Sequence, residues 1–259
     1  PVIDWRALAP LLIMFGAAVA GILVEALVPA RFRDETQLGL MIGAVLAAGG
    51  YSIANWRQGR VGPEAMGSIM LDGPTYLSWL ALLVFGGLAM LLFAERKVHG
   101  GVSTFASSAA TVPGSKGEAE ADRARMEQTE VLPLGVFALL GMMVFVSAND
   151  LITLFVALEV FSPPLYIMCA MARRRRLLSQ ESALKYVLLG ALSSGFFLFG
   201  IALLYGYSGS FDLKTIDVAV SSPVFGRGLL FAGLALLAVG LLFKVGVVPF
   251  HSWIPDVYT

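Results

Sequence analysis

Three charged residues stand inside or beside long apolar stretches, where a charge is expensive. Glu159 is the only charged residue of the stretch 151–172, Lys244 interrupts the last apolar run, and Lys185 lies at the start of the stretch 186–211. Ionisable residues within membrane helices usually mark ion pathways or proton relays, because each needs a partner or must change its protonation state. The three residues therefore predict proton transfer. For Glu159 the structural alternative is a hydrogen bond between helices.

The depths of Glu159 and Lys244 in a membrane follow from helix geometry. Glu159 comes nine residues after Asp150, which puts it about 14 Å below one surface and close to the midplane. Lys244 comes sixteen residues after Gly228, about 20 to 24 Å from the same surface, and its long side chain can bridge the difference. A lysine beside a carboxylate stabilises the ionised acid, while desolvation favours loss of the lysine proton. We therefore predict that protons move between the two.

Lys185 has two interpretations. It follows Glu181 by four residues, so it can be an intermediate station between the cytoplasm and the Glu159/Lys244 pair. A lysine near a helix end can also extend its side chain to the lipid headgroups without any further role. Ser193 and Ser194 lie about two turns deeper, where they can line a hydrated path or, as we favour, pack between helices.

Prolines interrupt two of the apolar stretches. Pro163 and Pro164 follow Glu159 within about one turn and predict a kink there. Pro249 and Pro255 flank His251, so an uninterrupted last helix would lose backbone bonds at both positions. We expect a broken helix, a feature typical of ion sites in transporters. Histidine titrates near neutral pH, so His251 can pass protons at the break. Its alternative is a hydrogen-bonded packing role.

The composition requires a membrane around these residues. Of the 259 residues, 58% are hydrophobic and 14% charged, whereas soluble domains carry about 25% charged residues. The net charge of zero excludes a basic nucleic-acid surface, and the single cysteine, Cys169, excludes an iron–sulfur cluster on this chain. Period-2 alternation is absent, so we expect an all-α bundle rather than a barrel. The seven predicted spans are 7–24, 36–56, 73–94, 131–149, 151–172, 186–211 and a last run from Gly228.

The basic residues predict the orientation of the bundle. The connections after the first, third and fifth spans hold eleven Lys and Arg, and the opposite side holds five. By the positive-inside rule the N-terminus is external. The connection 95–130 is then a flexible cytoplasmic loop that can end in a short amphipathic helix. The four arginines 173–176 are a topology signal on this reading, although a contact with anionic lipid is the alternative.

Three stretches resemble a known family. They are 149–166 (NDLITLFVALEVFSPPLY), 182–210 (SALKYVLLGALSSGFFLFGIALLYGYSGS) and 241–258 (LLFKVGVVPFHSWIPDVY). They resemble the antiporter-like subunits of bacterial respiratory complex I and of Mrp cation/proton antiporters. The resemblance makes Glu159 the carboxylate of the fifth helix, Lys185 the lysine of the sixth and Lys244 the lysine of a broken seventh, with His251 inside the break. It implies a fourteen-helix fold, of which 1–94 are the first three helices and 131–259 an incomplete first repeat.

The resemblance also implies a function. The chain is expected to be a proton-translocating subunit of NADH:quinone oxidoreductase in the bacterial inner (plasma) membrane, with no cofactor of its own. FMN, Fe–S clusters and quinone belong to partner subunits, and the neighbours are other membrane subunits, especially antiporter-like ones. The alternatives are a subunit of an Mrp-type antiporter or of a membrane-bound hydrogenase, and a non-pumping structural subunit.

Overall fold

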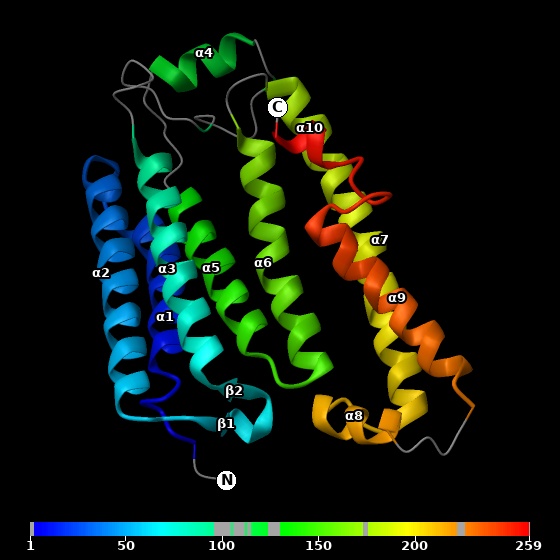
Figure 1. Cartoon of the computed structure of the whole chain (residues 1–259). Coiled ribbons are helices and arrows are strands. Elements are labelled where there is room, and N and C mark those ends of the chain that lie inside the picture. The colour runs from blue at the N-terminus through cyan, green and yellow to red at the C-terminus, as the bar shows by residue number, and fades with distance from the viewer. Residues whose placement is uncertain are drawn as a thin grey trace.

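The computed structural model describes residues 3–95, 105, 112, 115–123, 130–172, 176–221 and 226–258. Every predicted apolar stretch forms a helix, and Figure 1 shows them side by side as one bundle. These helices are α1 (Ala9–Leu27), α2 (Ala30–Arg57), α3 (Gly73–Ala94), α5 (Val131–Ser147), α6 (Leu151–Met171), α7 (Arg176–Ser208) and α9 (Gly228–Val245). Six are long and apolar enough to cross a membrane, and α5, at 17 residues, is shorter. The expected helical membrane bundle is confirmed, while the exact number of spans stays a prediction.

Two helices begin earlier than the apolar stretches predicted. α2 starts at Ala30 rather than at 36, and α7 starts at Arg176 rather than at 186. Hydropathy detects only the part of a helix that is apolar, whereas Arg and Glu are good helix formers and continue the helix beyond it. In α2 the extension is held by Arg33, which pairs with Glu25 of α1 at 3.1 Å and donates to the Val28 carbonyl at 2.7 Å.

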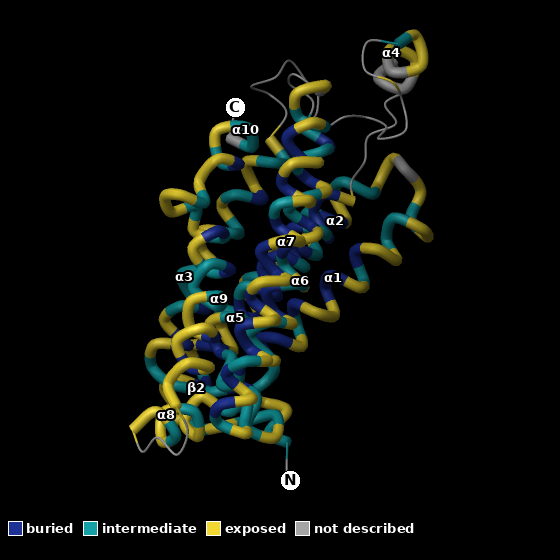
Figure 2. Tube along the Cα trace, turned by 90° about the vertical axis from the view of Figure 1, so that its right-hand side faces the viewer, coloured by how far each residue is buried: buried dark blue, intermediate teal, exposed yellow. Residues whose placement is uncertain are grey.

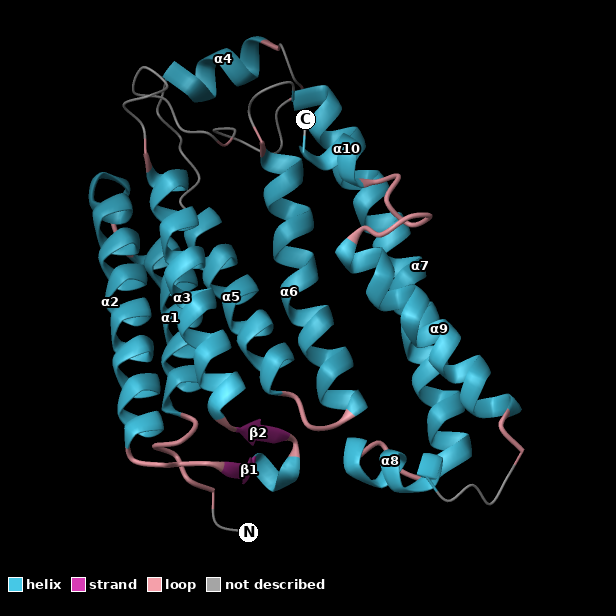
Figure 3. Ribbon diagram, in the orientation of Figure 1, coloured by secondary structure: helices cyan, strands magenta, loops and turns pink. Residues whose placement is uncertain are grey.

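A hairpin and a short helix between the spans were not predicted from the sequence (Figure 3). A two-stranded antiparallel hairpin, β1 (Gly62–Glu64) and β2 (Ile69–Leu71), encloses the 3-10 turn η1 (Ala65–Gly67), and α8 (Leu213–Ser221) follows α7. Strands of three residues are too short to give a readable alternation. The short helix α4 (Lys116–Arg123) lies in the loop 95–130, for which a short amphipathic helix was allowed from the sequence. Most of that loop, and the arginines 173–175, lie outside the described residues.

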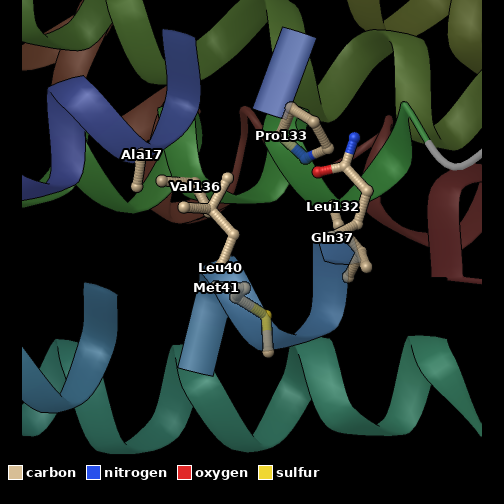
Figure 4. A pocket seen from close by; sticks show the side chains of 7 residues that line it. All are labelled: Ala17, Gln37, Leu40, Met41, Leu132, Pro133 and Val136. Atoms are coloured by element: carbon tan, nitrogen blue, oxygen red, sulfur yellow. The ribbon is translucent and has the colours of Figure 1, made fainter. Parts of the chain in front are cut away.

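The described residues form four buried apolar clusters, and Figure 2 shows the buried positions along the helices. One cluster joins α1, α2, α3 and α5 around fully buried side chains such as Trp79. The buried side chain of Gln37 lies within this cluster, beside Pro133 (Figure 4). The Gln37 side-chain amide donates to the Gly21 carbonyl at 2.7 Å. A second cluster joins α6, α7 and α9 around Phe197. The outer faces of the helices are apolar and exposed, as expected of surfaces that meet lipid.

The connections at one end of the bundle fix the start of α6. The N-terminus, the hairpin and α8 lie at this end, and α4 and α10 (Ile254–Tyr258) lie at the other (Figure 1). Asn149 donates its backbone N–H to the Ser68 carbonyl at 2.9 Å, and Leu151 donates to the Phe211 carbonyl at 3.0 Å. Asp150 caps α6 through its side chain. The depth of every residue along α6 is thereby set from both neighbouring connections.

Candidate functional site

One face of α6 carries three polar side chains. Glu159, Ser162 and Tyr166 are spaced by three and then four residues, so they lie above one another on the same side of the helix. Pro163 and Pro164 are inside α6, which is helical throughout, and they lack the N–H groups that would serve the carbonyls of the preceding turn. The kink predicted at these prolines stays a prediction.

Lys244 of α9 meets this face. Its Nζ donates to Ser162 Oγ at 2.8 Å and to Tyr166 Oη at 3.0 Å. The ammonium also lies 5.4 Å from the centre of the Tyr166 ring and 6.0 Å from that of Phe161. The aromatic faces add a weak attraction for the cation. Lys244 is thus held by neutral groups in a largely apolar place.

Glu159 belongs to the same site but makes no ion pair with Lys244. The two described side chains interact electrostatically, yet no nitrogen–oxygen distance between them is 4.0 Å or less. Glu159 Oε1 is buried and has no hydrogen-bond partner among the described residues. A buried polar atom without a partner costs about 1–3 kcal/mol, and more if it is charged. A proton or a cation bound at Oε1 would remove this cost.

Lys185 lies elsewhere. Its Nζ forms ion pairs with Glu181 at 2.8 Å and with Asp256 of α10 at 2.9 Å, and its side chain is 46% exposed. The structure does not bring Lys185 into contact with Lys244. The ion pair with Asp256 was not predicted, because the two residues are 71 positions apart and neither pattern nor spacing connects them. The cluster ties α7 to α10 at the end of the bundle opposite the N-terminus.

His251 is exposed and lies in the turns between α9 and α10, outside the Lys244 site. α9 ends where Gly246 adopts a left-handed conformation, with φ of 73°. Beyond it, the buried Trp253 stacks on Tyr186 at 4.5 Å between ring centres, and its Nε1 donates to the Phe243 carbonyl at 3.1 Å. Trp253 thus returns this segment to the bundle. That α9 and α10 are two halves of a broken membrane helix stays a prediction.

Ser162 and Tyr166 were not predicted from the sequence as partners of Lys244. Their spacing from Glu159 was the available signal, because residues three and seven positions on share its helix face. Ser193 is buried and donates to the Gly240 carbonyl of α9 at 3.1 Å, in keeping with the packing role favoured for it. Among the described residues, no group of three or more His, Cys, Asp and Glu is arranged to hold a metal ion.

Known proteins similar to this chain point to one family. Residues 148–259 match the family model described as NADH:quinone oxidoreductase/Mrp antiporter, TM. The whole chain aligns at 51% identity with NADH-quinone oxidoreductase subunit N of Nocardioides sp. and, also at 51%, with that of Mycobacteroides abscessus. The chain is therefore similar to the antiporter-like membrane subunits. It spans about half the length (50%) of these two curated relatives.

Solved structures agree with this family. The chain superposes on a subunit of respiratory complex I from Thermus thermophilus with a TM-score of 0.70 and 29% identity, covering 96% of this chain and 47% of that one. A chain of the Mrp complex from Dietzia sp. gives a TM-score of 0.66 at 19% identity, over 99% of this chain and 44% of the other. The second likeness shows the fold alone. The antiporter-like chain is accordingly a multi-pass membrane protein.

Proposed function

We propose that this chain forms part of a proton-translocating subunit of a bacterial NADH-quinone oxidoreductase in the inner membrane. Glu159 and Lys244 are the groups that gain and lose the proton. Electron transfer takes place on partner subunits, which carry FMN, Fe–S clusters and the quinone site. The neighbours in the membrane are other antiporter-like subunits and lipid. The similarity to subunit N over the whole chain supports this assignment above the Mrp antiporter alternative.

One observation carries the proposal. A partly buried lysine is bound to two neutral hydroxyl groups, and the nearby carboxyl group has a buried oxygen without a partner among the described residues. If the proton leaves Lys244 for Glu159, the N–H bond breaks, an O–H bond forms, and both side chains become neutral. In an apolar place that exchange is far easier than in a fully solvated ion pair, because desolvation penalises both charged forms. A small rearrangement of α6 against α9 then decides which group holds the proton.

The energy for transport comes from outside this chain. Moving one charge against a membrane potential costs about 2.3 kcal/mol per 100 mV, so redox chemistry on the partner subunits must drive the rearrangement. We place the N-terminus and the hairpin outside the cell, and the Lys185/Asp256 cluster at the cytoplasmic end, where Lys185 is the first station for an incoming proton. His251, exposed in the turns beyond α9, is proposed as a further relay group on that side.

The test uses the full-length subunit in its assembled complex, reconstituted into vesicles. We expect Lys244→Ala and Glu159→Gln to lower proton uptake per NADH oxidised, with the complex still assembled. Lys214→Ala is the matched control, since Lys214 lies on α8 away from the site. If both variants pump as the control does, the proposed function is wrong and the charges only fix helix packing. Genomic neighbours and co-purifying subunits separate this enzyme from an Mrp antiporter or a hydrogenase.

A further inference from the structure

The hydroxyl groups of Ser162 and Tyr166 do more than fill space beside Lys244. We propose that they are positioning residues that hold the Lys244 amine by two of its hydrogens, and that Gly190 makes room for the Tyr166 hydroxyl. The inference rests on the proposed function and deepens it. It assigns to two neutral side chains the task of orienting the group that exchanges the proton.

Counting hydrogens shows why two hydroxyls suit this task. An ammonium group has three N–H hydrogens and a neutral amine has two. Ser162 Oγ and Tyr166 Oη accept one each, at 2.8 and 3.0 Å. The third position of the nitrogen therefore holds either a proton or a lone pair. Lys244 can keep the same two hydrogen bonds in both protonation states, so its nitrogen can stay in place when the proton leaves.

Ser162 is committed to accepting from Lys244. Its own hydroxyl hydrogen is donated to the Leu158 carbonyl at 2.6 Å, one turn back on α6. The oxygen is thereby oriented with its lone pairs available, and the side chain is buried. Serine back-bonding of this kind usually serves only the helix, but here the oxygen also receives a second, charge-assisted bond.

Tyr166 depends on α7 for its position. A Cβ atom built on Gly190 would lie 2.2 Å from Tyr166 Oη and 2.9 Å from Cζ, so no larger residue fits there without moving the tyrosine. The ring is also fixed edge-on against Tyr186, with 4.5 Å between ring centres. Gly195, one and a half turns further along α7, faces open space. The position of the Tyr166 hydroxyl, and not the geometry of α7, therefore requires a glycine at position 190.

The variants separate positioning from packing. Tyr166→Phe keeps the ring and its contact with Tyr186 and removes only the hydroxyl. Ser162→Ala removes the acceptor, and Ser162→Thr restores a hydroxyl that can make the same back-bond. Gly190→Ala keeps both hydroxyls but displaces that of Tyr166. The controls are Gly195→Ala and Tyr205→Phe, because Tyr205 is 45% exposed on α7.

The measurement is proton uptake per NADH oxidised, in vesicles containing the whole complex with the full-length subunit. We expect Tyr166→Phe, Ser162→Ala and Gly190→Ala each to lose at least about half of the uptake that Lys244→Ala loses, since hydrogen bonds to charged groups are strong. Ser162→Thr and the two controls should retain the parent value.

The outcomes also separate this inference from the proposed function. If Lys244→Ala lowers uptake while Tyr166→Phe and Ser162→Ala do not, the positioning role is wrong and the function stands. If Lys244→Ala has no effect, the function is wrong and the inference with it. Should Gly190→Ala prevent assembly, Tyr166→Phe decides, because it leaves every ring contact in place.

Discussion

Gly200 is the position at which the contact between α7 and α9 can be tested most directly. A Cβ atom there would lie 2.6 Å from the Leu237 nitrogen and 2.8 Å from the Gly233 carbonyl oxygen, both in the backbone of α9. Ordinary contacts of a Cβ atom begin at 3.4 Å, so Gly200→Ala forces the helices apart by about 0.6–0.8 Å. Backbone atoms cannot rotate away as a flexible side chain can.

The cost follows from two opposing effects. Overpacking of this kind costs about 1–3 kcal/mol, while alanine is better than glycine in a helix by about 1 kcal/mol. Gly195→Ala on the same helix gains the second effect without the first, because nothing lies within 4 Å. The two variants should therefore differ in stability by about 1–3 kcal/mol. At about 2–4 °C per kcal/mol for a domain of this size, that is roughly 2–12 °C in melting temperature.

The difference in stability between the two variants is measured by heating the purified complex and recording the temperature at which this subunit is lost. We expect Gly200→Ala to melt earlier than Gly195→Ala. It should also pump less, because Lys244 lies two turns beyond Leu237 on α9 and its bonds at 2.8 and 3.0 Å leave little slack. Equal melting temperatures and equal pumping for the two alanine variants would show that the helices do not touch as described.

Two further predictions concern the ends of the helices. The pKa of Asp212 lies below its ordinary value of about 3.9, because its carboxylate accepts bonds from the Thr215 hydroxyl and backbone N–H, both at 2.8 Å. The bonds that cap α8 are fully formed at pH values above the ordinary pKa of about 3.9, and they are lost as the pH falls through the lowered pKa of Asp212. We therefore expect hydrogen exchange of the α8 amides to accelerate below the lowered pKa in the parent protein and not in Asp212→Asn. Trp253→Ala should destabilise the packing of α10 by about 3–5 kcal/mol, and Trp253→Phe by about 1 kcal/mol, because phenylalanine loses only the hydrogen bond to the Phe243 carbonyl. The rate of proteolytic cleavage in the segment after α9 measures both effects. Equal protection of the two variants would contradict the stacking of Trp253 on Tyr186.

The starts of α6 and α9 could be predicted from the sequence, whereas the facing of the helices could not. Counting from Asp150 and Gly228 placed Glu159 about 14 Å and Lys244 about 20 to 24 Å from the same surface. The helices α6 and α9 do begin at or beside these two starting residues. The count works because helical rise is fixed. Membrane helices are apolar on all sides, however, so periodicity does not say which face meets which neighbour.

The facing decides what Lys244 binds. The charges predicted a partnership of Lys244 with Glu159, but the hydroxyls of Ser162 and Tyr166 are the groups within hydrogen-bond distance. Opposite charge alone does not predict the hydrogen-bond partner of Lys244, because desolvation opposes a buried ion pair and the rotation of α6 decides which side chains face the lysine. Lys185 illustrates the same point, since its partner Asp256 comes from a distant segment that no local pattern connects to it.

Some glycines mark the places where two helices approach closely, but the sequence does not show which glycines these are. A Cβ at Gly141 of α5 would lie 2.7 Å from the backbone nitrogen of Phe161, the residue before Ser162. A Cβ at Gly190 of α7 would meet Tyr166 from the opposite neighbour. α6 is thus approached closely on two sides, by α5 and by α7, at the level of the face that holds Lys244. A Cβ at Gly195 would meet nothing within 4 Å, so the close contacts of α6 lie at two particular glycines and cannot be found from glycine content alone.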